Sequence, residues 1–144
     1  PEETHEPVEV KGVEHPSEAA LCSLMYRHAE CRISLKTEDA LNLLRNPTAR
    51  NTALSLFTEN VDGLNILWAE LGDTDMLAVI ARGDEICARM NGLTTGEKFR
   101  SIYYALRERY TARCIHELIS KLQKSEATSE ELSELMRLKQ CHGR

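Results

Sequence analysis

The sequence predicts an all-α fold, in which a multi-helix bundle is followed by a C-terminal two-helix hairpin that a long helix connects to the bundle. Three observations support this class. Only 5% of the 144 residues are aromatic while 42% are hydrophobic, so the core must consist mainly of aliphatic side chains, as in packed helices. Apolar residues recur at spacings of three and four along most of the chain. Two capping boxes, at Thr94 with Glu97 and at Thr128 with Glu131, mark the starts of the last two helices.

The N-terminal part begins with a linker and continues with three helix starts. Residues 1–15 mix Pro, Glu and His without a period, so we expect a flexible linker. A first helix is expected from Ser17, which suits an N-cap, and a second from Thr37, which precedes two carboxylates. Asn46 followed by Pro47 is typical of a third helix start, because Asn caps well and Pro suits the first helical position.

The rest of the bundle is expected to extend to residue 93. Gly72 suits the C-terminal end of a fourth helix, because glycine readily adopts the left-handed conformation found there. Residues 76–90 are apolar on both sides of Gly83, which leaves open one kinked helix or two short helices before Gly92. The bundle is therefore assigned to residues 16–93. The core stripe expected on the fourth helix comprises Leu64, Leu67, Trp68 and Leu71.

The last third of the chain, residues 94–144, is the most regular part. After the first capping box, an apolar stripe continues for about 28 residues, which corresponds to a helix of ~42 Å. The second capping box opens a short helix, on which Leu132, Leu135 and Met136 share a face that can pack on the long helix. Leu138 lies about 60° off that stripe. We expect a helical hairpin whose remaining apolar surface binds a partner.

Composition excludes several classes of function. The net charge of −5 and the isoelectric point near 5.6 disfavour direct binding to duplex DNA, which usually requires a basic surface. The five cysteines are odd in number and widely spaced, which fits neither a disulfide framework nor a zinc knuckle and favours the cytoplasm. No segment approaches the ~20 apolar residues that cross a membrane.

Motifs for catalysis or metal binding are incomplete. His116 and Glu117 begin like a zinc-protease motif, but Ser120 stands where the second histidine ligand belongs. Residues 73–75 resemble the start of a calcium loop without its later ligands, and residues 141–142 offer two metal ligands alone. We therefore expect no catalytic residue, metal or cofactor in this chain, and an enzyme assembled from scattered His and Glu residues is disfavoured.

Basic residues cluster on the long helix. Two interpretations stay open: solvated side chains paired with neighbouring glutamates, or an anchor for an acidic peptide or protein surface. The residues concerned are Lys98, Arg100, Arg107, Arg109 and Arg113.

Residues 116–141 (HELISKLQKSEATSEELSELMRLKQC) resemble the C-terminal helicase-binding domain of bacterial DnaG-type primases. The family pattern has Glu-Leu-Ile, a short polar turn, Ser or Thr before paired glutamates, spaced leucines and a final Leu-x-Gln. Residues 17–31, the Glu-Asp pair after Thr37, and residues 46–51 resemble the family's opening more weakly, with residues 28–31 departing from its usual Pro-Glu.

The resemblance implies a helical bundle and hairpin that dock on the N-terminal domain of the replicative hexameric helicase and couple primer synthesis to the replication fork, in the cytoplasm at the nucleoid. It further implies that the domain itself has no catalytic activity or cofactor, and that the full-length protein is a DNA primase, a DNA-directed RNA polymerase. Both a monomer and a dimer with exchanged hairpins are compatible with it. The helicase-binding residues that it implies are Leu132, Leu135, Met136, Leu138, Lys139 and Gln140.

Some family members also bind the acidic tail of the single-stranded-DNA-binding protein. From charge alone, we assign this role to Arg109 and Arg113. The alternative that the residues leave open is a stand-alone helical adaptor or oligomerisation module unrelated to replication, in which the same hairpin mediates self-association.

Overall fold

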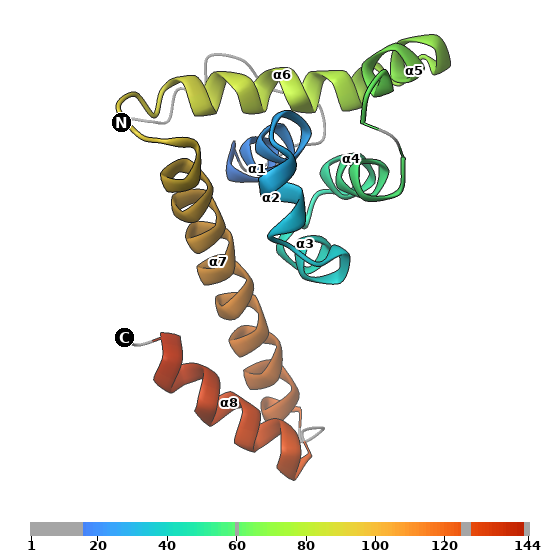
Figure 1. The fold of residues 1–144 in the computed structure, drawn as a ribbon. Helices are drawn as coiled ribbons and strands as arrows, with labels where there is room; N and C mark the ends of the chain where they lie inside the picture. The colour runs from blue at the N-terminus through green and yellow to red at the C-terminus, as the bar shows by residue number, and fades with distance from the viewer. Residues whose placement is uncertain (1–15, 60, 125–127, 143–144) are drawn as a thin grey trace, which may run out of the picture. The chain divides into compact units, whose positions relative to one another are not determined.

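The structure is a computed structural model that describes residues 16–59, 61–124 and 128–142. These residues form eight α-helices and no strand (Figure 1), which confirms the predicted all-α class. The linker expected at residues 1–15 lies outside the described residues. Within the described ranges, no helix combines the length and the apolar character needed to span a membrane.

The helices belong to two compact units, and the division between Tyr103 and Tyr104 falls inside the seventh helix. The first unit holds six helices and the first turns of the seventh, and the second unit holds the rest of the seventh helix and the eighth. The helices are α1 (Pro16–Arg27), α2 (Ala29–Ile33), α3 (Thr37–Leu43), α4 (Pro47–Thr58), α5 (Leu64–Leu71), α6 (Thr74–Ala88), α7 (Thr95–Gln123) and α8 (Ser129–His142).

The centre of the first unit is the contact between α1 and α6, which α4 also joins (Figure 1). Gly83 lies at the point of closest approach. A Cβ atom on Gly83 would lie 2.1 Å from the carbonyl oxygen of Ala19 and 2.5 Å from the Cβ of Ser23. Because no side chain fits there, glycine permits the two backbones to approach closely. This answers the question left open by the sequence: residues 74–88 form one helix, and Gly83 serves helix packing instead of interrupting it.

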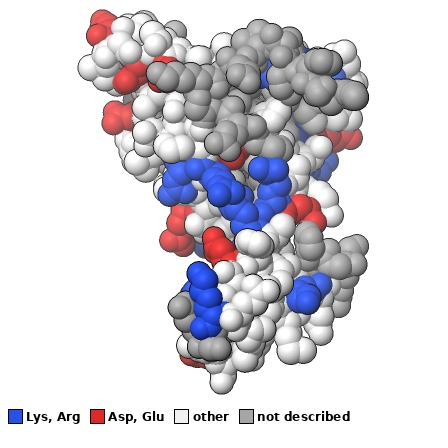
Figure 2. Space-filling model, turned by 180° about the vertical axis from the view of Figure 1, so that it is seen from behind, with Lys and Arg blue, Asp and Glu red and all other residues white. Residues whose placement is uncertain are grey.

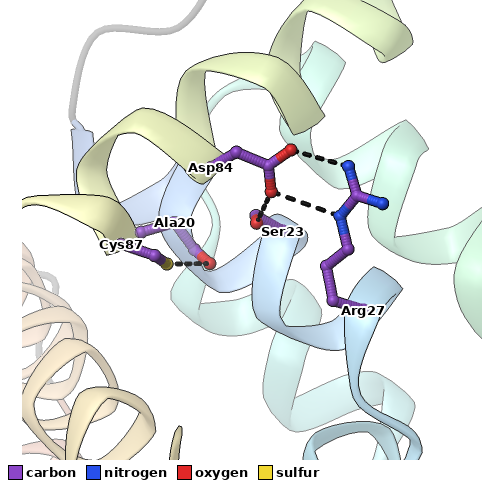
Figure 3. Close-up of polar contacts among 5 residues, drawn as sticks. All are labelled: Ala20, Ser23, Arg27, Asp84 and Cys87. Atoms are coloured by element: carbon purple, nitrogen blue, oxygen red, sulfur yellow. Dashed lines mark hydrogen bonds and ion pairs between the residues drawn. The ribbon is translucent and has the colours of Figure 1, made fainter. Parts of the chain in front are cut away.

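Polar side chains join α1 to α6 beside that contact (Figure 3). The carboxylate of Asp84 accepts a hydrogen bond of 2.5 Å from the Ser23 hydroxyl and an ion-paired one of 2.7 Å from Nη2 of Arg27. Hydrogen bonding to Asp84 raises the pKa of Arg27 above its ordinary value. The buried Ser23 hydroxyl is thereby satisfied, so we assign these residues to the fold.

A buried glutamate ties the start of α4 to α1. The carboxylate of Glu18 accepts hydrogen bonds of 3.0 Å from the backbone N–H groups of Arg45 and Asn46. The side chain of Asn46 in turn accepts from the N–H groups of Thr48 and Ala49, with Pro47 as the first helical residue. The predicted Asn46 cap is confirmed, and the buried Glu18 is explained by the backbone donors that it satisfies.

Other predicted helix ends agree only in part. Gly72 ends α5 with a positive φ of 76°, as expected. Ser17 lies inside α1, which begins at Pro16, and Thr37 is the first residue of α3 and not its cap. The short α2 was not expected, because five residues are too few to show a helical period.

Both predicted capping boxes are confirmed. The Thr94 hydroxyl accepts the N–H of Glu97 at 3.1 Å, while the Glu97 carboxylate accepts the N–H of Thr94 at 2.9 Å. Thr128 and Glu131 form the same reciprocal pair, at 3.1 and 3.0 Å. Each box satisfies two N–H groups that a helix start would otherwise leave unpaired.

Candidate functional site

The six residues assigned to helicase binding all lie on α8, where they separate into two groups. Leu135 is buried, with 7% of its surface exposed, and Leu138 is half-buried. Met136 is 66% exposed and Leu132 is 39% exposed. Lys139 and Gln140 are also exposed.

Helix geometry explains this separation. Leu132, Met136 and Gln140 are spaced by four residues and therefore follow one side of α8, with Lys139 next to Met136. We call these four residues the α8 face. Leu135 and Leu138 lie three residues apart on another side. The sequence pattern placed Leu135 and Met136 on one packed stripe, whereas the structure buries the first and exposes the second.

Charged residues connect α8 to the end of α7 and flank its exposed side. Nζ of Lys121 on α7 lies 2.6 Å from Oε2 of Glu131 in the first turn of α8. This hydrogen bond, supported by the backbone N–H of Thr128, lowers the pKa of Glu131 below its ordinary value. Glu134 and Arg137 form a second ion pair along α8, which lowers the pKa of Glu134. The first turn of α8 is thus held by its cap and by α7.

The α8 face has apolar side chains at its centre and polar side chains beside them. It combines a flexible, polarizable methionine, a leucine, and the longer polar side chains of Lys139 and Gln140. Methionine adapts to irregular partner surfaces, and an apolar centre with polar neighbours is the usual composition of an interface.

The two arginines assigned to an acidic peptide differ in their surroundings. Arg109 is exposed, whereas Arg113 is half-buried, with its guanidinium carbon 5.7 Å from the centroid of the Tyr110 ring. They are four residues apart, so they share one side of α7. Both basic and acidic side chains are visible on the face drawn in Figure 2, and the net charge of the chain is −5.

The residues of the incomplete motifs that the structure describes are not gathered into a metal site. His116 and Glu117 are exposed on α7, and Cys141 is exposed on α8. Burial raises the pKa of the Cys22 and Cys31 thiols, which keeps them protonated. Across the described ranges, no three His, Cys, Asp or Glu residues gather closely enough to hold a metal ion.

The exposed apolar surface of α5 was not predicted from the sequence. Leu67 and Leu71 were assigned to the core stripe of α5, but they are 39% and 65% exposed, and the neighbouring Ile66 is 60% exposed. Only Leu64 and Trp68 of that stripe are buried. The signal was available: with Ile66 included, α5 carries more apolar residues than one packed side of a short helix can bury.

Comparison with known proteins identifies no relative, since no family model, curated protein or solved structure matches the chain. The similarity to the primase domain, carried by residues 116–141, therefore stays a prediction.

Proposed function

We propose that this chain is a non-catalytic protein-interaction domain of a bacterial DNA primase, and that it docks on the N-terminal domain of the replicative hexameric helicase through the α8 face. The observation that carries the proposal is the exposure of Met136 and Leu132 on the helix whose sequence resembles the helicase-binding part of the primase family.

Energetics favour a partner for this side of α8. Fully burying a Met or Leu side chain contributes roughly 1.5–3 kcal/mol relative to leaving it in water. Most binding energy at an interface comes from a few such anchors. Met136, with 66% of its surface exposed, has the most left to gain among the large apolar residues of α8.

The buried Leu135 has a supporting role in this proposal. Because it is 7% exposed, its truncation would disturb α8 before it affected any partner. Lys139 and Gln140 extend the same side towards the end of the helix, where they supply polar contacts around the apolar anchors. Catalysis belongs to other parts of the primase, and the role of this domain is to bring priming to the fork.

The test is a calorimetric titration of the chain with the helicase N-terminal domain. We expect saturable binding that Met136→Ala weakens about tenfold, as expected for an apolar anchor. The matched control is Ile33→Ala, since Ile33 is 83% exposed on α2 in the other unit. Circular dichroism verifies that both variants stay folded.

Two outcomes contradict the proposal. The first is the absence of binding by the unmodified chain. The second is equal binding by Met136→Ala and the unmodified chain, which would move the contact away from the α8 face. If sedimentation shows self-association that Met136→Ala abolishes, and no helicase binding is detected, the chain is instead the oligomerisation module that the sequence left open.

A further inference from the structure

The outer side of α5 is an apolar surface that the fold leaves uncovered. Leu64 and Trp68, four residues apart, hold α5 in the first unit, and the Trp68 ring stacks on Tyr26 with 6.0 Å between centroids. By contrast, four exposed side chains of α5 define its outer side: Ile66, Leu67, Glu70 and Leu71. At 100° per residue, Ile66, Glu70, Leu67 and Leu71 follow one another in that order around about 140° of the helix surface, so the four form one continuous patch.

Two glycines fix the ends of this short helix. Gly63 and Gly72 have φ values of 83° and 76°, so each supports a left-handed turn that other residues rarely adopt. At the C-terminal end, the N–H of Asp73 donates to the carbonyl of Trp68 at 2.8 Å. These turns and the buried Trp68 hold the outer side of α5 in place before any partner binds, which lowers the entropic cost of association.

The charged residues of the chain segment that contains α5 are all acidic. Residues 51–81 contain no Lys, Arg or His. Glu70 lies on the outer side of α5 itself, and Asp75 is exposed at the start of α6. The acidic residues of this segment are Glu59, Asp62, Glu70, Asp73 and Asp75. An apolar surface with an acidic surround attracts a partner that combines apolar side chains with Lys or Arg.

We propose that the outer side of α5 is a docking site for a basic amphipathic helix of another protein. Apolar side chains of that helix contact Ile66, Leu67 and Leu71, and its Lys or Arg residues face Glu70 and Asp75. Nucleic acids and acidic peptides are disfavoured by the same carboxylates. A second copy of this chain is disfavoured in the symmetric arrangement usual for dimers, because α5 would meet an identical acidic surface.

The probe is a 14-residue amphipathic peptide of leucine and lysine, without tryptophan, titrated against the full chain. Trp68 is the only tryptophan of the chain and lies in α5, so its fluorescence reports binding at this helix. We expect a saturable change in Trp68 fluorescence. A peptide of equal pattern with glutamate in place of lysine is expected to produce none, since its charge matches that of the site.

The matched variants are Ile66→Ser with Leu71→Ser, and Ile33→Ser as the control. The paired substitution is expected to weaken binding about tenfold, because it removes two apolar contacts. The control, an exposed isoleucine on α2, is expected to bind as the unmodified chain does. In a separate variant, Glu70→Lys with Asp75→Lys is expected to weaken binding and remove most of its salt dependence.

Each contrary result overturns the proposal. These are the absence of binding, equal binding by the unmodified chain and the variant with both Ile66→Ser and Leu71→Ser, equal binding of the glutamate peptide, and self-association that this paired substitution abolishes. The site is independent of the α8 face, so Met136→Ala is expected to leave peptide binding unchanged. Helicase binding and α5 docking can therefore fail separately.

Discussion

Replacing Gly83 by alanine perturbs the closest contact between α1 and α6. The added Cβ would lie 2.1 Å from the carbonyl oxygen of Ala19, whereas real Cβ atoms essentially never approach closer than 3.0 Å. The obstacle is backbone, which cannot rotate away as a flexible side chain does. The two helices must therefore separate by about 0.9 Å, the difference between those two distances.

Separating the two helices lowers the free energy of unfolding by more than the higher helix propensity of alanine raises it. Overpacking a core costs about 1–3 kcal/mol, and a gap near 1 Å also removes a quarter to a half of the dispersion energy between the facing atoms. We place the cost at about 3 kcal/mol, and alanine recovers about 1 kcal/mol through its higher helix propensity. The expected net loss is about 2 kcal/mol, which lowers the melting temperature by roughly 4–8 °C.

The assay is thermal and urea unfolding followed by circular dichroism, with Gly96→Ala as the matched control. Gly96 is also helical, but its added Cβ would meet Nη1 of Arg100 at an ordinary 3.6 Å. We expect Gly96→Ala to be neutral or to stabilise by about 0.5 kcal/mol. A Gly83→Ala protein that melts at or above the unmodified temperature would refute the close packing of α1 on α6.

Three further predictions concern the second unit and the cysteines. Carbon-detected NMR titration is expected to give Glu131 a pKa below its ordinary 4.5, and Lys121→Met is expected to raise that pKa. The ion pair stabilises the folded state above pH 4.5, and this stabilisation is lost as pH falls through the folded-state pKa. An unchanged pKa of Glu131 in Lys121→Met would contradict the contact between the two side chains. Thiol labelling of the native protein at pH 8 is expected to modify the exposed Cys141 first and Cys22 only on unfolding, because burial raises the pKa of Cys22. Labelling in the reverse order would contradict the burial of Cys22. Arg109→Glu is expected to abolish binding of a peptide with the acidic tail of the single-stranded-DNA-binding protein, and unchanged fluorescence anisotropy would exclude Arg109 from that site.

Local signals in the sequence predicted much of the fold. The capping boxes at Thr94 and Thr128, the Asn46 cap and the Gly72 helix end each depend on residues within a few positions of one another. Such patterns act through the nearby backbone, so they are legible without knowledge of tertiary contacts. The all-α class follows from the same local information.

What the sequence did not predict depends on contacts between distant residues. The sequence left open whether Gly83 kinks one helix or separates two, because the contact that requires a glycine there is with Ala19, on another helix. Leu67 and Leu71 fitted a core stripe, yet the fold covers only the neighbouring side of α5. Periodicity identifies an apolar side of a helix and does not say whether another element covers it.

The candidate site shows the same limit at the scale of single residues. Leu135 and Met136 are adjacent and both apolar, so the pattern gave them the same role. Successive residues on a helix differ in direction by about 100°, and the structure buries one and exposes the other. The α8 face therefore contains four of the six residues that were predicted to bind the helicase.

The measurement that tests the central claim most directly is the calorimetric titration of this chain, and of its Met136→Ala variant, with the helicase N-terminal domain. The account predicts saturable binding by the unmodified chain and about tenfold weaker binding by Met136→Ala, with Ile33→Ala unchanged. No heat of binding from the unmodified chain, or equal affinities for all three proteins, would contradict it.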